Sequence, residues 1–184
     1  MGTLQCPRTA VLLIPALLLC AGMRDWALDF QPCDGQMQSP INIDPKTTTF
    51  SPELQPIMLS GYDLPPSESL KLKKNGHTIM LSLPENLTMT GGYAQEYRAA
   101  QLHLHWGSRG EPGSEHTVNG HRFAGEIHVV YYNSRFDNIK EAMSEPGGLA
   151  VLAAFLEAGP EENVPYQHIL EHLEEVQEEG KALS

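Results

Sequence analysis

The chain has 184 residues, and its 12 lysines and arginines against 23 aspartates and glutamates give a formal net charge of −11. This length suits one domain of ordinary size with a single core. The negative charge argues against nucleic acid or an anionic membrane surface as a partner, because both repel a surface of the same sign.

The first 22 residues have the layout of a secretory signal peptide. Residues 1–10 carry Arg8 and no acid, residues 11–19 form an apolar run, and small residues follow up to Gly22. The apolar run is shorter than the about 20 residues that a spanning helix needs, and no later segment is apolar enough to anchor the chain. We expect cleavage after Gly22 and a mature domain, residues 23–184, that is secreted or otherwise extracellular or lumenal.

Two further residues bear on this location. Removal of the signal peptide would leave Cys33 as a solitary cysteine in an oxidising compartment. It would pair with another chain, giving a disulfide-linked dimer, or with a segment absent here, or it would be an inert buried thiol. Asn86-Leu87-Thr88 is an N-glycosylation sequon, which predicts a glycan on Asn86 in a surface loop.

Residues 26–66 are broken into short pieces by proline and glycine, and no long helix fits there. Short strands are then predicted, separated by the tight-turn pair Asn75-Gly76 and by Pro84. They are Leu70 to Lys74, Thr78 to Leu83 and Leu87 to Thr90. This hairpin or meander pattern predicts a mostly antiparallel sheet.

A cluster of histidines follows on two predicted strands. His103 and His105 alternate with leucines and therefore share one face of their strand. His128 lies in a second strand, Glu126 to Val130. If the two faces coincide, three imidazoles converge and leave a fourth position open, which is the ligand set of a catalytic zinc.

The alternative is that these histidines are hydrogen-bonded residues of the core. For one histidine that interpretation prevails. Three costly polar rings are rarely buried together in an ordinary core, and the pattern His-x-His with a third His two residues from a Glu therefore favours the metal.

The remaining segments are less specific. Residues 107–120 are rich in glycine and are predicted to be a loop that reverses the chain. Leu149 to Leu156 is either a buried strand or a helix, and its alanines favour the helix. Val164 to Glu179 has apolar residues at three- and four-residue steps, which predicts an amphipathic surface helix.

Several motifs in this order resemble the alpha-class carbonic anhydrases over nearly the whole mature chain. They are Gln38-Ser39-Pro40-Ile41-Asn42-Ile43, Asn75-Gly76-His77, Gln101-Leu102-His103-Leu104-His105-Trp106-Gly107, Gly113-Ser114-Glu115-His116-Thr117-Val118, Glu126-Ile127-His128 and Gly148-Leu149-Ala150-Val151-Leu152. The run from Gly147 to Asn163 looks most like the extracellular branch, and within it carbonic anhydrase IX. The resemblance implies a mainly β (α+β) fold, a large, twisted, mostly antiparallel sheet with peripheral helices, and it makes Leu149 to Leu156 a strand.

The resemblance also implies an activity, the reversible hydration of carbon dioxide to bicarbonate and a proton by a zinc lyase, and residue roles. His103, His105 and His128 would bind zinc, and Gln101 and Glu126 would orient their rings. His77 would relay the proton, Asn75 would order water, and Glu115 would orient a threonine that acts on the zinc-bound nucleophile. Val130 and Val151 would line the carbon dioxide pocket, and His116 matches a structural histidine.

By the same resemblance, the family's domain continues past Ser184 with the threonine partner of Glu115 and the cysteine partner of Cys33. We therefore expect a truncated chain. Two functions stay open. One is the zinc lyase, favoured by the intact histidines, and the other is an inactive or non-catalytic carbonic-anhydrase-like binding module, favoured by the early end.

Overall fold

A computed structural model describes residues 13–15, 38–65, 70–74, 78–91, 93–108, 110–161, 163, 167 and 182–183. Most described strands belong to one nine-stranded sheet, in the order β1-β11-β10-β7-β5-β4-β12, with β6 paired to β7 and β3 paired to β6. Its strands are β1 (Leu13–Pro15), β3 (Met58–Ser60), β4 (Leu72–Lys74), β5 (Ile79–Ser82), β6 (Thr88–Gly91), β7 (Tyr93–Trp106), β10 (Gly125–Asn133), β11 (Leu149–Leu156) and β12 (Ala182–Leu183).

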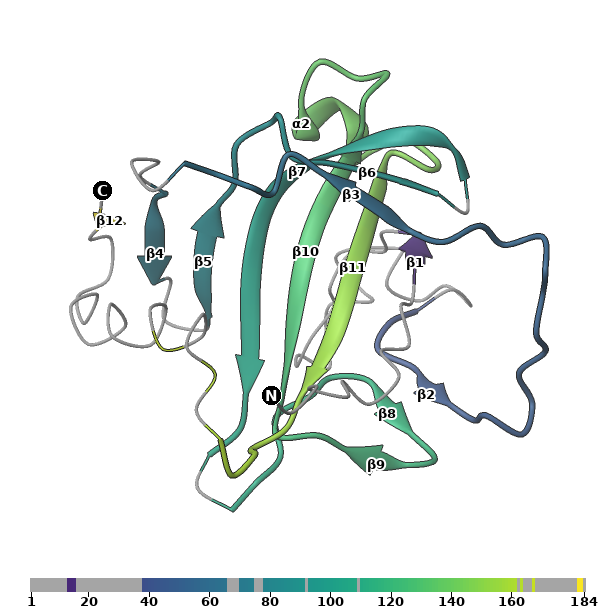
Figure 1. Ribbon diagram of the computed structural model, residues 1–184, viewed down its shortest axis with the longest axis vertical. Coiled ribbons are helices and arrows are strands. Elements are labelled where there is room, and N and C mark those ends of the chain that lie inside the picture. The colour runs from purple at the N-terminus through teal and green to yellow at the C-terminus, as the bar shows by residue number, and fades with distance from the viewer. Residues whose placement is uncertain are drawn as a thin grey trace, which may run out of the picture.

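This sheet confirms the predicted fold class. All its pairings are antiparallel. Figure 1 shows β7, β10 and β11 as the long central strands, with β5 and β4 continuing the sheet on one side. A smaller sheet of β2 (Asn42–Ile43), β8 (Thr117–Val118) and β9 (His121–Arg122) lies near the lower end of β11.

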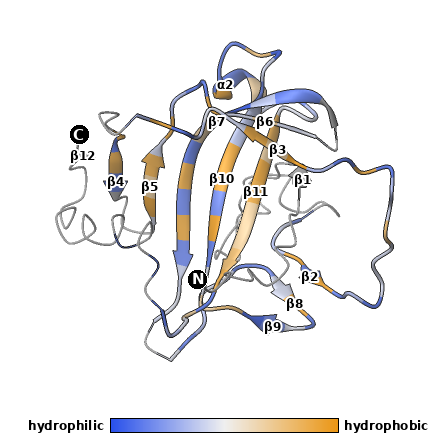
Figure 2. Cartoon of the chain, in the orientation of Figure 1, coloured by the Kyte–Doolittle hydropathy of each residue, from blue (hydrophilic) through white to orange (hydrophobic). Residues whose placement is uncertain are grey.

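The predicted strands are confirmed to within one or two residues, because alternation and tight turns define them locally. Residues 70–74, 78–83 and 87–90 contain β4, β5 and β6. Leu149–Leu156 is strand β11 over its full length, as the family resemblance implied and the alanines did not. Figure 2 shows why: β7 and β10 alternate in hydropathy, whereas β11 is apolar almost throughout and lacks a period that would identify it.

Two short elements differ from the sequence prediction. The segment 107–120 is not only a loop, because Thr117–Val118 form β8, which pairs in parallel with β2 and antiparallel with β9. A four-residue helix, α2 (Ile139–Ala142), was not predicted. The side chain of its N-cap residue Asn138 accepts a hydrogen bond from the Glu141 backbone N–H at 3.1 Å.

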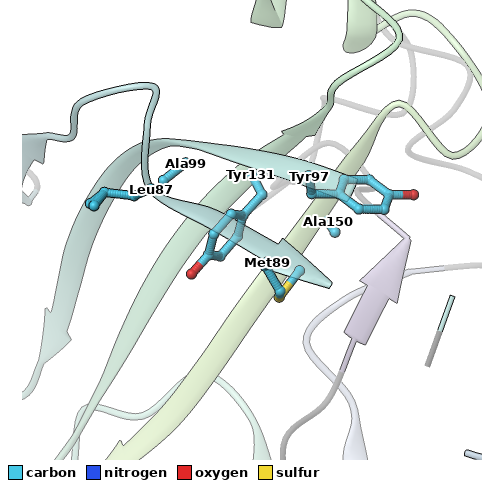
Figure 3. Packing of buried hydrophobic residues seen from close by; sticks show 6 residues of the cluster. All are labelled: Leu87, Met89, Tyr97, Ala99, Tyr131 and Ala150. Atoms are coloured by element: carbon cyan, nitrogen blue, oxygen red, sulfur yellow. The ribbon is translucent and has the colours of Figure 1, made fainter. Parts of the chain in front are cut away.

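The main apolar core lies between β6 and the central strands. Leu87 and Met89 pack against Ala99 and Tyr131, with Tyr97 and Ala150 completing the cluster (Figure 3). Val129 and Leu152 pack against the same cluster. Since side chains alternate along a strand, Val129 and His128 lie on opposite faces of β10, and the core therefore supports the sheet from the side away from the histidines.

Several expectations concern residues outside the described part. The signal peptide prediction for residues 1–22 falls there except for Leu13–Pro15, which pair with β11 as β1. The predicted helix over Val164 to Glu179 also falls there, apart from Gln167, whose backbone N–H donates to the Asn163 carbonyl at 3.0 Å. In the part of the chain that the structure describes, no helix has the length and apolar character needed to cross a membrane.

Candidate metal centre

The three predicted histidines converge on one face of the sheet. In the antiparallel pair of β7 and β10, His128 lies directly opposite His103, and Glu126 lies opposite His105. The ring centroids are 4.9 Å apart for His103 and His105, 5.1 Å for His103 and His128, and 4.7 Å for His105 and His128. One nitrogen of each ring lies within 4.8 Å of the other two, so that a single ion can contact all three.

Hydrogen bonds fix which ring nitrogen remains for a ligand. His103 Nδ1 is 2.9 Å from Gln101 Oε1, and His128 Nε2 is 2.9 Å from Glu126 Oε1. Both oxygens are acceptors, so these ring nitrogens carry the proton. The lone pairs of His103 Nε2 and His128 Nδ1 are therefore free for a metal, which is the arrangement that outer hydrogen-bond partners impose on ligand histidines.

The third ring shows the same fit from the other direction. His105 Nε2 is buried and has no hydrogen-bond partner among the described residues. A buried nitrogen without a partner is unfavourable unless another group, such as a metal ion, satisfies it. Three imidazole nitrogens that face one point are the donors that zinc prefers, and the residues present therefore fit this metal.

The surroundings keep the rings in the neutral form that metal binding needs. Burial lowers the pKa of His103 to about 4, and the neighbouring His128 and His105 lower it further. Burial also lowers the pKa of His105, although the nearby Glu115 carboxylate opposes the shift. At pH 7 His103 is therefore deprotonated before any metal arrives, and protons do not compete for its lone pair.

Glu126 is the hydrogen-bonding hub beneath the histidines. It is only 1% exposed, and it accepts from the backbone N–H groups of Glu115 and His116 at 2.9 Å each, from His116 Nδ1 at 2.7 Å and from His128 Nε2 at 2.9 Å. Burial alone would raise the pKa of Glu126, but the hydrogen bonds from His116 and His128 hold that pKa well below its ordinary value. Glu126 is therefore ionised, and its charge compensates its own burial.

The loop that brings Glu115 and His116 to this hub is anchored by residues to which the sequence assigned no role. Ser114 Oγ donates to the His116 carbonyl at 2.8 Å and accepts from the Phe123 backbone N–H at 2.9 Å. Asn42 Oδ1 accepts from Thr117 Oγ1 at 2.8 Å. These contacts join residues far apart in the sequence, and only the serine inside a family motif hinted at them.

Glu115 extends toward the histidines rather than toward a hydroxyl group. Its Oε2 lies 3.5 Å from His105 Nε2 and 3.9 Å from His128 Nδ1. That oxygen is buried and accepts no hydrogen bond from the described residues. Its position so close to two ligand nitrogens was not foreseen from the sequence, because it depends on how the loop folds.

The two predicted pocket valines lie beside the metal centre. Val130 shares the face of His128, two residues away, and Val151 of β11 lies directly opposite Val130. On the other side of the site, Met80 of β5 lies opposite His103. Together these side chains give the histidine face an apolar border.

Other predicted site residues are less constrained. Asn75 and His77, and also Cys33, lie outside the described residues, so that the water-ordering, proton-relay and dimer assignments stay predictions. Asn86 is exposed in the turn before β6, while the next residue, Leu87, is buried in the core.

The fold and this site define a class of protein, and comparison with known families gives the same class. Residues 21–184 match the eukaryotic-type carbonic anhydrases. The chain belongs to the carbonic anhydrase family.

Individual relatives are carbonic anhydrases of two kinds. Carbonic anhydrase 6 of Bos taurus is 41% identical over 162 residues, 86% of this chain and 50% of the relative. Carbonic anhydrase 6 of Homo sapiens is 39% identical over 159 residues, 85% of this chain and 51% of the relative. Carbonic anhydrase 12 of Homo sapiens is 38% identical over 162 residues, 87% of this chain and 45% of the relative.

The chain thus spans about half the length of these curated relatives. They support the family and do not support a special likeness to carbonic anhydrase IX. The run from Gly147 to Asn163, which suggested that likeness, is too short to distinguish members of the family.

Proposed function

We propose that the chain carries the metal centre of a zinc-dependent carbonic anhydrase, which interconverts carbon dioxide plus water with bicarbonate plus a proton. The observation that carries this proposal is the convergence of three imidazoles whose outer nitrogens are already engaged by Gln101 and Glu126. When bound, a zinc ion supplies Lewis acidity that makes water nucleophilic near neutral pH.

The chain's own residues would divide the remaining work. His103, His105 and His128 hold the ion, and Gln101 and Glu126 keep two of the three rings in the tautomer that ligation requires. Val130 and Val151 offer an apolar wall against which an uncharged carbon dioxide molecule can lie. The assignment of the proton relay to His77 and of water ordering to Asn75 completes the proposal by family resemblance.

The metal assignment is tested by removing the ligands. We expect the parent chain to bind about one zinc ion and the triple variant His103→Ala, His105→Ala, His128→Ala to bind none, because no donor set remains. Metal content of the purified proteins and competition against a chelator measure this. The matched control is His121→Ala, which removes an exposed histidine outside the cluster. Equal zinc content in the parent and the triple variant would refute the metal centre.

We also propose that the protein works outside the cell or in a lumen, modified on Asn86. The support is the predicted signal peptide together with a sequon whose asparagine is exposed in a turn. In a secreting cell, endoglycosidase treatment should increase the gel mobility of the parent and leave Asn86→Gln unchanged. Asn119→Gln, an exposed asparagine outside any sequon, is the control. A parent whose mobility does not respond would contradict the glycan.

A further inference from the structure

The carboxylate of Glu115 has an unusual position within the metal centre. Its Oε2 lies 3.5 Å from His105 Nε2 and 3.9 Å from His128 Nδ1, two of the nitrogens that face the proposed ion. Ligands about 2.0–2.1 Å from a tetrahedral zinc lie roughly 3.3 Å from one another. Glu115 Oε2 is therefore close to the separation expected between ligands of the same ion.

The hydrogen bonds of Glu115 and its neighbours fix this position. The Glu115 backbone N–H donates to Glu126 Oε2 at 2.9 Å, and the next backbone N–H, that of His116, donates to the same oxygen at 2.9 Å. Ser114 is fully buried and holds the preceding turn. The backbone at Glu115 is thus clamped, and only its side-chain rotation remains to be determined.

The carboxylate also lacks an alternative partner. Glu115 Oε2 is buried and accepts no hydrogen bond within the described part of the chain. A buried carboxylate oxygen without a donor is strongly unfavourable, and coordination to a cation relieves that cost. Carboxylate oxygen is an accepted zinc ligand at about 2.0–2.2 Å.

We propose that in this 184-residue chain Glu115 is the fourth zinc ligand and closes the coordination shell of the three histidines. The inference rests on the proposed metal centre and goes beyond it, since three protein ligands leave a position for reactants whereas four make a closed, structural type of site. The chain would then hold zinc firmly and hydrate carbon dioxide poorly. A hydrogen-bond donor supplied to Glu115 from elsewhere would draw the carboxylate away and open the site.

Zinc affinity and access to the fourth position test this proposal without measuring catalysis. Glu115→Gln should weaken zinc binding at least tenfold in chelator competition, a loss of the size that removing a supporting group causes. In the cobalt-substituted parent, azide should leave the visible absorption spectrum unchanged, because no position is free. In cobalt-substituted Glu115→Gln, azide should change the spectrum.

The control and the contrary outcomes are distinct. Glu111→Gln removes the same charge from an exposed position of the same loop and should behave as the parent. Equal zinc affinity of parent and Glu115→Gln, with a parent spectrum that responds to azide, would overturn the fourth-ligand proposal and leave the three-histidine centre intact. A parent chain that binds neither zinc nor cobalt would overturn the proposed function and this inference together.

Discussion

Replacement of Glu126 by alanine should destabilise the protein by about 3–5 kcal/mol, the usual cost of removing one partner from a buried charged network. Glu126 satisfies two backbone N–H groups and the rings of His116 and His128. Each donor left without a partner in the interior is itself unfavourable by about 1–3 kcal/mol. Since total stability is about 5–15 kcal/mol, the variant should lie near the limit of folding.

Urea unfolding of the metal-free proteins measures this effect, with Glu157→Gln as the control. Glu157 is exposed and meets only His121, at 3.9 Å, so its substitution should change stability by no more than about 0.5 kcal/mol. Glu126→Gln retains one acceptor oxygen and should fall between the two. A midpoint for Glu126→Ala close to that of Glu157→Gln would show that the network contributes little.

The same residue predicts a pH dependence with a definite sign. The folded-state pKa of Glu126 is below its ordinary value of 4.5, since the hydrogen bonds from His116 and His128 outweigh burial. The stabilisation by the carboxylate is therefore present above about pH 4.5 and is lost as the pH falls through the folded-state pKa. Stability of the parent should decline in this acid range more steeply than that of Glu126→Ala.

The main strands and the histidine cluster could be predicted from the sequence because both depend on local periodicity. Alternation places His103 and His105 on one face, and the Asn75-Gly76 turn with Pro84 separates β4, β5 and β6. The two-residue strands β8 and β9 could not be predicted, since two residues carry no period. Helix α2 could have been found from Asn138 and Glu141, which form a capping pattern three residues apart.

The parts of the site that escaped prediction depend on contacts between distant segments. The pairing of β2 with β8 joins Asn42 to Thr117 and sets the end of the loop that carries Glu115. No local pattern indicates that a loop carboxylate reaches within 3.5 Å of His105. The sequence therefore identified the ligand set, and the structure was needed to find the group that competes for the open position.

The second large effect is expected at Gly113, where the site loop meets the end of β7. A Cβ atom at this position would lie 1.9 Å from the Gly107 nitrogen and 2.0 Å from the Trp106 carbonyl carbon. Both are backbone atoms, which cannot rotate away as a side chain does. Gly113→Ala should therefore force the loop from β7, at about 3 kcal/mol or more, the upper end of the range for overpacking.

The displacement should also reach the metal centre, because Gly113 and Ser114 donate to the Phe123 carbonyl at 3.0 and 3.1 Å and thereby position Glu115 and His116. We expect a lower thermal midpoint and weaker zinc binding in the same variant. The control is Gly159→Ala, where a Cβ would meet nothing within 4 Å and the backbone is not left-handed. That change should be neutral or stabilising by up to about 1 kcal/mol, since alanine restricts the unfolded chain. If Gly113→Ala matched Gly159→Ala in both measurements, the close approach of the loop to β7 would not be what holds Glu115 and His116 at the metal centre.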